Sequence, residues 1–281
     1  MSVTNLDEPE SLASIVRRAQ AGDAAALEQV VLAVRDRVYR LSLRMTARPP
    51  DAEDATQEIL IRVITRLSTF RGEAAFSTWV HRIAVNHLLD RSKNCVERLE
   101  MDFDRFAADL IDGLSSGPSA APDAAILERE VQLACTHALL TCLDRDHRIA
   151  YILGEIFEVD SDEGGYICDV PPSTYRKRLS RARARVREFL SHNCGLVSRT
   201  AACHCSKRVD VAVRLGRVDP HRLEFTDTTT SANDDLIRLH DAAGLLRSLP
   251  AATLPTSTVD MVARLIHTST AAGANVAVDG T

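Results

Sequence analysis

The stretch PPSTYRKRLSRARARVREFL, Pro171 to Leu190, places seven cations between Arg176 and Arg187 and has no carboxylate before Glu188. The chain as a whole is acidic, with 39 Asp and Glu against 34 Lys and Arg. On a helical wheel a narrow apolar stripe runs along the stretch and is flanked on both sides by guanidinium groups. We therefore expect a helix that packs on a core through this stripe, which comprises Tyr175, Leu179, Ala182, Val186 and Phe189.

A turn precedes this basic helix. The sequence DVPPST supplies prolines that suit the first turn of a helix, and Ser173 or Thr174 can cap it. Upstream, DSDEGGYIC suits a short helix, which would complete a helix-turn-helix whose second helix enters the major groove. Six of the seven cations are Arg, which binds phosphates and guanine edges bidentately. The pattern favours DNA as the partner over a solvated basic face or an acidic protein.

Helical periodicity continues over most of the chain, and the sequence has no convincing alternation of strand type. The 281 residues are 45% hydrophobic and 26% charged, which is ordinary for a soluble globular protein. No apolar run is long enough to cross a bilayer, and the N-terminus lacks the basic leader and apolar core of a secretory signal. We expect an all-α, cytoplasmic protein. Seven cysteines, an odd number, argue against a disulfide framework.

An acidic helix is predicted earlier in the chain, in PPDAEDATQEILIRVITRLSTF. It begins with the helix breaker Pro49-Pro50 and with Asp51, a good N-cap. One side carries apolar residues at helical spacing, and the other carries carboxylates around an apolar residue. That second side suits docking on a basic protein partner, although a solvated face with one stray Ile is the alternative. The candidate docking residues are Asp54, Gln57, Glu58 and Ile61.

The next segment, FRGEAAFSTWVHRIAVNHLLDRSK, predicts a helix capped by Ser77 or Thr78. One of its faces groups a Trp with Arg and Asn, so the ring can stack on a base while the polar groups hold phosphates or base edges. Aromatic rings that only fill the core are the alternative. The candidate nucleic-acid residues are Phe70, Arg71, Phe76, Trp79, Arg82 and Asn86.

Four segments together, DAEDATQEI, FRGEAAFSTWVHRIAVNHLLDR, LDRDHR and STYRKRLSRARARV, resemble in this order an extracytoplasmic-function (ECF) sigma factor of bacteria. The resemblance implies two small helical domains joined by a flexible linker, followed here by a mostly helical extension. The expected parts are sigma region two at 12–94, the linker at 95–123, the region-four helix-turn-helix at 124–190, and the extension at 191–281.

The resemblance also implies roles for the candidate residues. The acidic helix would bind core RNA polymerase, and the Phe70 to Arg91 segment would open and read the minus-ten promoter element. The basic helix would read the minus-thirty-five element in the major groove. No enzymatic activity is implied, and an anti-sigma protein stays open as a further partner. The minus-thirty-five candidates are Ser173, Thr174, Tyr175, Arg176, Arg178 and Arg181.

The sequence departs from the family pattern at two places. Gly164-Gly165 stand where a branched residue and an Ala are usual, and each glycine weakens a helix by about 1 kcal/mol relative to Ala. We therefore expect a short or mobile support helix, in which the small residues still allow the two motif helices to approach closely. Asp144 and Arg145 replace common prolines, a change that we expect to be harmless.

The extension brings Cys194, Cys203 and Cys205 together with His192 and His204. Thiolates with imidazoles suit Zn(II), and thiolates suit Cu(I), so the three cysteines are candidate metal ligands. The family includes members whose cysteine-rich extension senses metal. Reduced thiols that pack a small lobe are the alternative. Two further amphipathic helices are expected near Asp234 to Leu249 and Ser257 to His267.

Two other functions compete with promoter recognition. A helix-turn-helix regulator that binds duplex DNA without a role in the polymerase would explain the basic helix alone. A metal-sensing regulator would explain the cysteines of the extension. Neither alternative gives a task to the Asp54 to Ile61 face or to the Trp79 segment.

Overall fold

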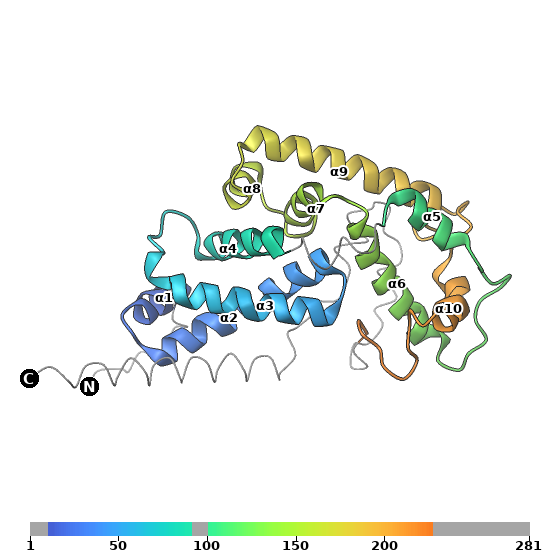
Figure 1. The fold of residues 1–281 in the computed structure, drawn as a ribbon, viewed down its shortest axis with the longest axis horizontal. Helices are drawn as coiled ribbons and strands as arrows, with labels where there is room; N and C mark the ends of the chain where they lie inside the picture. Colours follow the sequence, from blue (N-terminus) through green and yellow to red (C-terminus); the bar gives the residue numbers. More distant parts are fainter. Residues whose placement is uncertain (1–10, 92–100, 227–281) are drawn as a thin grey trace, which may run out of the picture.

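The computed structural model describes residues 11–91 and 101–226. These residues fold into helices joined by short turns, and the only β pairing among them is two isolated bridges. Figure 1 shows α1 to α4 in one group, with α7 to α9 in a second group above them and α6 set apart at one end. The predicted all-α fold is confirmed.

The first group comprises four helices: α1 (Leu12–Gln20), α2 (Ala24–Thr46), α3 (Pro49–Arg66) and α4 (Phe76–Arg91). Its sequence contains the signals that begin and end them. Asp23 accepts a hydrogen bond from the Ala26 amide and caps α2, and Ala47 ends this helix in the left-handed conformation. The predicted breaker at Pro49 occupies the first turn of α3, where a missing amide hydrogen is harmless.

The second group comprises α7 (Arg145–Tyr151), α8 (Ser161–Cys168) and α9 (Pro172–Asn193), with a π-helical turn at Ile152–Ile156. Helix α6 (Ala124–Thr141) precedes it in the chain and contacts α2. Asp144 caps α7 by accepting a hydrogen bond of 3.1 Å from the His147 amide. This residue stands where the family pattern has a proline, so the substitution supplies a cap in place of a rigid first turn.

The two glycines of the helix-turn-helix have separate steric tasks. A Cβ at Gly164 would lie 2.3 Å from the Tyr175 ring, and a Cβ at Gly165 would lie 2.9 Å from the Val170 carbonyl oxygen. Helix α8 nevertheless forms over eight residues. The glycines therefore allow the close approach of α8 and α9, as expected, and Tyr175 fills the space that a larger residue would take.

Helix α5 (Phe103–Ile111), the short helical piece expected in the linker, lies against the end of α9. Its Phe106 ring stacks on Phe189 near the end of α9, with ring centroids 5.4 Å apart. A helix that the sequence did not suggest, α10 (Cys205–Arg214), follows α9 and packs on α6. The two amphipathic helices expected further along the extension lie outside the described residues.

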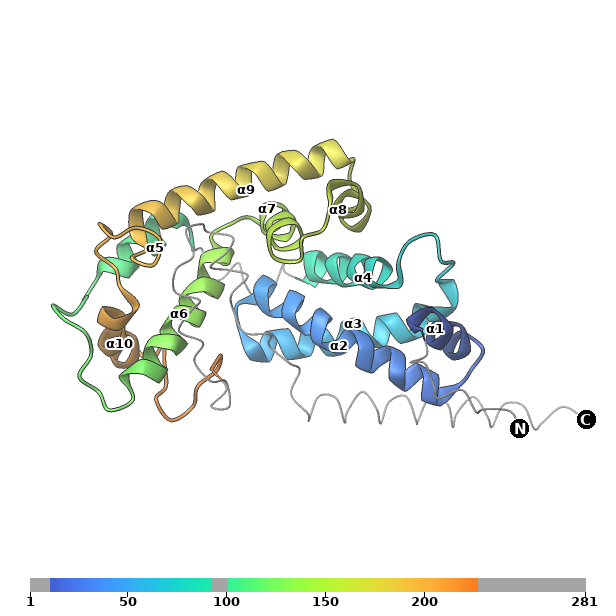
Figure 2. The ribbon, with the colours of Figure 1, turned by 180° about the vertical axis from the view of Figure 1, so that it is seen from behind.

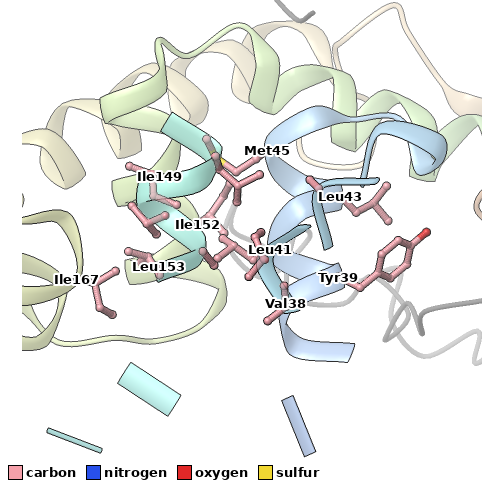
Figure 3. Packing of buried hydrophobic residues seen from close by; sticks show 14 of the residues in the cluster. Val38, Tyr39, Leu41, Leu43, Met45, Ile149, Ile152, Leu153 and Ile167 are labelled. Atoms are coloured by element: carbon pink, nitrogen blue, oxygen red, sulfur yellow. The ribbon is translucent and has the colours of Figure 1, made fainter. Parts of the chain in front are cut away.

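The two groups share one hydrophobic core. Figure 3 shows Leu41 and Met45 of α2 close to Ile149 of α7 and Ile152 of the following turn. The Arg148 guanidinium, buried at this junction, donates a hydrogen bond of 2.8 Å to the Met45 carbonyl oxygen. In both whole-molecule views α9 lies at the outer edge, with α7 and α8 between it and the first group (Figures 1 and 2).

Candidate functional site: a nucleic-acid interface on two helices

The basic helix α9 turns its predicted apolar stripe into the core, where Tyr175, Ala182 and Val186 are fully buried. Its outer face carries Ser173, Lys177 and Arg181, which follow one another at four-residue spacing and are all exposed. Residues at this spacing form one row along a helix, so a hydroxyl, an ammonium and a guanidinium project together from the N-terminal half of α9.

Other cations of α9 are tied to carboxylates of the same group of helices. Arg178 lies 2.6 Å from Asp146 of α7, and Arg185 lies 3.7 Å from Asp144. Arg183 forms an ion pair with Glu155 of the π-helical turn. These pairs hold the flanks of α9 on α7, so the outer row is the part of the basic surface best placed for an external partner.

The structure bears on one residue of the minus-thirty-five prediction, Tyr175, and on one residue outside it, Lys177. Tyr175 is fully buried and its hydroxyl donates a hydrogen bond of 3.3 Å to the Ala150 carbonyl oxygen, so this ring supports α9 from inside. Its DNA contact stays a prediction. Lys177 was missing from the candidates although it lies between Ser173 and Arg181 in the row. The four-residue spacing in the sequence could have identified it.

The acidic helix α3 keeps its predicted two-sided character. Ala52, Ala55 and Ile59 are buried, whereas Asp54 and Glu58 are exposed on the other side. Gln57 and Ile61 are half-buried there. The main neighbours of α3 are α2 and α4 of its own group, and this outer face lies away from α8 and α9.

The aromatic candidates of α4 and the preceding loop form one cluster. The Trp79 ring lies 5.4 Å from Phe70 and 5.6 Å from Phe76, measured between centroids. Phe76 is 8% exposed and belongs to the core, so it supports the cluster from beneath, and its DNA contact stays a prediction. Trp79 and Phe70 are half-buried, and Arg71 and Asn86 are exposed.

Helix α8 covers part of the polar face of α4. The Arg82 guanidinium forms an ion pair of 2.7 Å with Asp169 and lies 4.6 Å from the centre of the Tyr166 ring. One turn earlier, the Thr78 hydroxyl donates a hydrogen bond of 2.6 Å to Glu163. The groups of Arg82 that would hold DNA are therefore occupied by the support helix of the second motif in this conformation.

Beneath this contact lies a buried histidine. The Arg37 Nε donates a hydrogen bond of 2.9 Å to His81 Nε2, and the His81 ring stacks on Phe157 from the second group of helices. Burial first, and then the charge of Arg37, lower the pKa of His81 to about 3. A neutral imidazole is thus part of the junction between the two groups.

The three predicted metal-ligand cysteines lie around one cavity of about 30 Å³ between α5, α6 and the segment after α9. A fourth cysteine, Cys135 of α6, lines the same cavity, although its sequence context predicts only a packing role. Burial raises the pKa of Cys203 to about 11 and that of Cys205 to about 12. His192 and His204, the other candidate ligands, do not line this cavity.

Within 11–91 and 101–226, no three or more His, Cys, Asp and Glu side chains stand in positions that could hold a metal ion. The four thiols therefore surround the cavity without meeting inside it. In the same ranges, no helix combines the length and the apolarity needed to cross a membrane.

The helix-turn-helix presents a row of cations to solvent, and the other helical unit contains a helix with a cluster of aromatic rings beside it. These two features define a DNA-binding protein with two helical units. The comparisons with known proteins agree with this class. Residues 30–94, which span most of α2 to α4, match the family model described as Sigma-70 region 2.

Three curated relatives match 62 to 64% of the chain. The ECF RNA polymerase sigma factor SigE of Mycolicibacterium smegmatis is 31% identical over 188 residues, which cover 64% of this chain and 68% of the relative. The RNA polymerase sigma-H factor of Pseudomonas aeruginosa is 29% identical, over 63% of this chain and 92% of its own. The ECF RNA polymerase sigma factor SigW of Bacillus subtilis is 27% identical, over 62% and 94%. The chain belongs to the ECF RNA polymerase sigma factors.

Proposed function

We propose that this sigma factor reads promoter DNA with the outer row of α9 and the polar face of α4, and docks on core RNA polymerase through the outer face of α3. As an ECF sigma factor the chain is a transcription initiation factor and not an enzyme. It binds core polymerase and promoter DNA, and the polymerase carries out RNA synthesis. We place this activity in the cytoplasm, where its polymerase partner works.

The observation that carries the residue assignment is the division of cations on α9. Arg178, Arg183 and Arg185 are paired with carboxylates of α7 and the turn that follows, whereas Lys177 and Arg181 point outward. In a helix-turn-helix, the N-terminal half of the second helix contacts base edges and its flanks contact phosphates. We assign Ser173, Lys177 and Arg181 to base and phosphate contacts, with Thr174, Arg176 and Arg178 at their edges.

The minus-ten contacts are assigned to α4. A half-buried Trp79 beside Phe70 leaves part of an aromatic face for a base that has left the stack, and Arg82 and Asn86 follow along the helix. Unstacking a base costs a few kcal/mol, least for an already open strand, which makes this pocket selective for melted promoter. Arg82 must first leave Asp169 and Tyr166 to take part.

The parts of the chain follow from these assignments. Region two spans 12–94 with α1 to α4, the linker spans 95–123 with α5, region four spans 124–190 with α6 to α9, and the extension spans 191–281. The extension is held on the linker: the buried Arg208 of α10 donates a hydrogen bond of 2.7 Å to the Asp109 carbonyl oxygen. We infer that the extension regulates the sigma factor by restraining this linker.

The test is run-off transcription by purified bacterial core polymerase with the full-length protein, on the promoter of the gene's own operon and on a random library of upstream sequences. We expect specific transcripts that depend on the added protein and co-elution of the protein with core polymerase. Duplex DNA binding without polymerase association would contradict the docking role of α3 and favour a helix-turn-helix regulator that acts alone.

A further inference from the structure

We propose that Asp144 and Asp146 of α7 set the sequence specificity of α9, because they withhold Arg185 and Arg178 from the phosphate backbone of DNA. Both are positioning residues, which act through the guanidinium groups that they hold and make no DNA contact of their own. The inference rests on the promoter-reading role proposed for α9. It adds how such a basic helix avoids binding every duplex equally well.

Seven cations on one helix favour DNA of any sequence. Phosphate contacts do not depend on sequence, and they supply essentially all of non-specific binding. Each further cation that reaches a phosphate therefore strengthens binding to every duplex, whereas base contacts distinguish one sequence from another. A protein that reads promoter sequence gains specificity when some of its cations are kept from the backbone.

Helix α7 supplies carboxylates that can keep them there. It packs against α9, and Asp146 Oδ2 lies 2.6 Å from Arg178 Nη2 (Figure 1). Asp144 Oδ2 lies 3.7 Å from Arg185 Nη1, two turns further along α9. Residues seven positions apart lie on the same side of a helix, so Arg178 and Arg185 together form the flank that faces the start of α7.

The other flank of α9 is held in the same way. Glu155 of the π-helical turn forms an ion pair with Arg183. Ion pairs therefore border the apolar stripe on both sides, and the exposed row of Ser173, Lys177 and Arg181 projects between them. This arrangement leaves the row to meet the bases while the flanks stay on the protein.

Asp144 carries a fixed negative charge. It caps α7 by accepting a hydrogen bond of 3.1 Å from the His147 amide, and it lies 2.7 Å from Nδ1 of the His147 ring. Burial by itself would raise the pKa of this carboxyl group, but the hydrogen bonds with His147 and the charge of Arg185 lower it. The group is therefore ionised at neutral pH. Because the family pattern has a proline here, this charge is a departure of this chain from that pattern.

The ion pairs lie where a phosphate could compete for the guanidinium groups, since the side chains of Arg178 and Asp146 are 24% and 49% exposed. In a complex fixed by base contacts of the outer row, the flank facing α7 stays turned toward the protein. A non-specific complex lacks these base contacts, so the helix can roll and a freed guanidinium would gain a phosphate contact. The carboxylates thus weaken non-specific binding more than promoter binding.

The experiment compares the DNA affinities of full-length wild type, Asp146→Asn and the double variant Asp144→Asn/Asp146→Asn, from fluorescence anisotropy over a range of salt concentrations. One duplex carries the sequence that the wild type with core polymerase selects from a random library, and the other is a scrambled duplex of the same length. Asn caps a helix as well as Asp does, so the double variant keeps the cap of α7. Glu28→Gln, at an exposed position of α2, removes the same charge elsewhere and is the matched control.

We expect Asp146→Asn to bind the scrambled duplex roughly fivefold more tightly, with a salt slope steeper by about one, because one more phosphate is contacted. The double variant should show a larger gain. Affinity for the selected sequence should change by no more than about twofold, so the ratio of specific to non-specific affinity falls. Adding Arg178→Ala to Asp146→Asn should remove the gain, because the freed cation is gone. Loss of folding cannot produce a gain of affinity, and Glu28→Gln should bind as the wild type does.

Three results would overturn the inference alone. One is an unchanged affinity and salt slope of the double variant on the scrambled duplex. Another is an equal gain on both duplexes, which would show that the carboxylates limit affinity and not specificity. The third is a gain that persists in Asp146→Asn/Arg178→Ala. A wild type that selects no sequence from the library would instead contradict the promoter-reading role of α9, and this inference with it.

Discussion

The outer faces of α3 and α4 belong to the same domain and differ in what covers them. The α3 face, with Asp54 and Glu58, is exposed, and its helix packs mainly within its own group. The α4 face is covered by α8, which engages Thr78 and Arg82 through a hydrogen bond, an ion pair and an aromatic ring. The surface that we propose for polymerase docking is therefore accessible in the conformation that engages Thr78 and Arg82 of the proposed minus-ten surface.

This difference suggests an order of events. On the proposed assignments, core polymerase docks on α3 without any rearrangement, whereas promoter DNA reaches Arg82 only after α4 and α8 separate. Separating them breaks the polar contacts of Thr78 and Arg82 at the rim of the junction. It also breaks the ring stacking of His81 on Phe157 beneath them. We expect polymerase binding to supply the free energy that separates the two groups of helices.

The largest expected effect concerns the outer row of α9. Lys177→Ala with Arg181→Ala removes two exposed cations and should lower run-off transcription and specific duplex affinity about a hundredfold, because each such contact is worth roughly 1–3 kcal/mol. The control is Arg199→Ala, an exposed cation of the extension. An unchanged DNA affinity of the double variant, measured at matched salt concentration, would show that the outer row of α9 does not contact promoter DNA.

The next effect concerns the exposed outer face of α3. Asp54→Lys should weaken the association with core polymerase about tenfold, because reversing one rim charge opposes a complementary surface. Glu28→Lys, at an exposed position of α2, makes the same charge change elsewhere and should bind normally. Equal affinities of the two variants, from competition against wild type, would show that docking uses another surface.

The buried junction under α4 should make stability depend on pH. His81 has a folded-state pKa of about 3 against an ordinary value of 6.5, so the unfolded chain binds the proton first. The stabilisation is complete above pH 6.5 and is lost as the pH falls toward 3. We expect a loss of about 1 kcal/mol at pH 5.5, as one pH unit is worth about 1.4 kcal/mol.

Urea unfolding at pH 7 and pH 5.5 measures this loss. His81→Gln should reduce the pH dependence without abolishing it, because burial also lowers the pKa of His137 to about 4. A variant with the same slope as the wild type would show that His81 is not the group responsible.

The smallest expected effect concerns the rim of the covered face. Asp169→Asn keeps a residue type that tolerates the left-handed conformation found at this position, where φ is 55°. It removes a partly exposed ion pair worth up to about 1 kcal/mol, so binding of single-stranded DNA should improve two- to fivefold. Quenching of Trp79, the chain's single Trp, reports this binding. Asp162→Asn on the same helix is the control and should change nothing.

The sequence was sufficient for features that depend on local periodicity. The stripe of α9 and the two-sided α3 appear as predicted because a 3.6-residue period places buried residues on one side whatever the partner is. The same wheel placed Tyr175 on the apolar stripe, yet the family resemblance suggested a DNA contact for it. The structure buries the ring, as the wheel predicts, and the DNA contact stays a prediction.

Contacts between residues far apart in the chain could not be predicted from the sequence. Arg82 and Asp169 lie 87 positions apart, and no local pattern indicates that these two residues meet. Cys135 looked like a small core residue because a single cysteine in a helix carries no spacing signal, and only the fold brings it to the other three thiols. Helix α10 was missed for a related reason, since tertiary contacts with α6 stabilise its ten residues.

The central claim, that the α4 face is closed in the free protein and opens on core polymerase, can be measured by the reactivity of arginines toward phenylglyoxal, followed by mass spectrometry. In the free protein we predict rapid modification of Arg62, exposed on α3, and slow modification of Arg82. Addition of core polymerase without DNA should accelerate modification of Arg82. Arg82 reacting as fast as Arg62 in the free protein, or staying slow in the complex, would contradict the account.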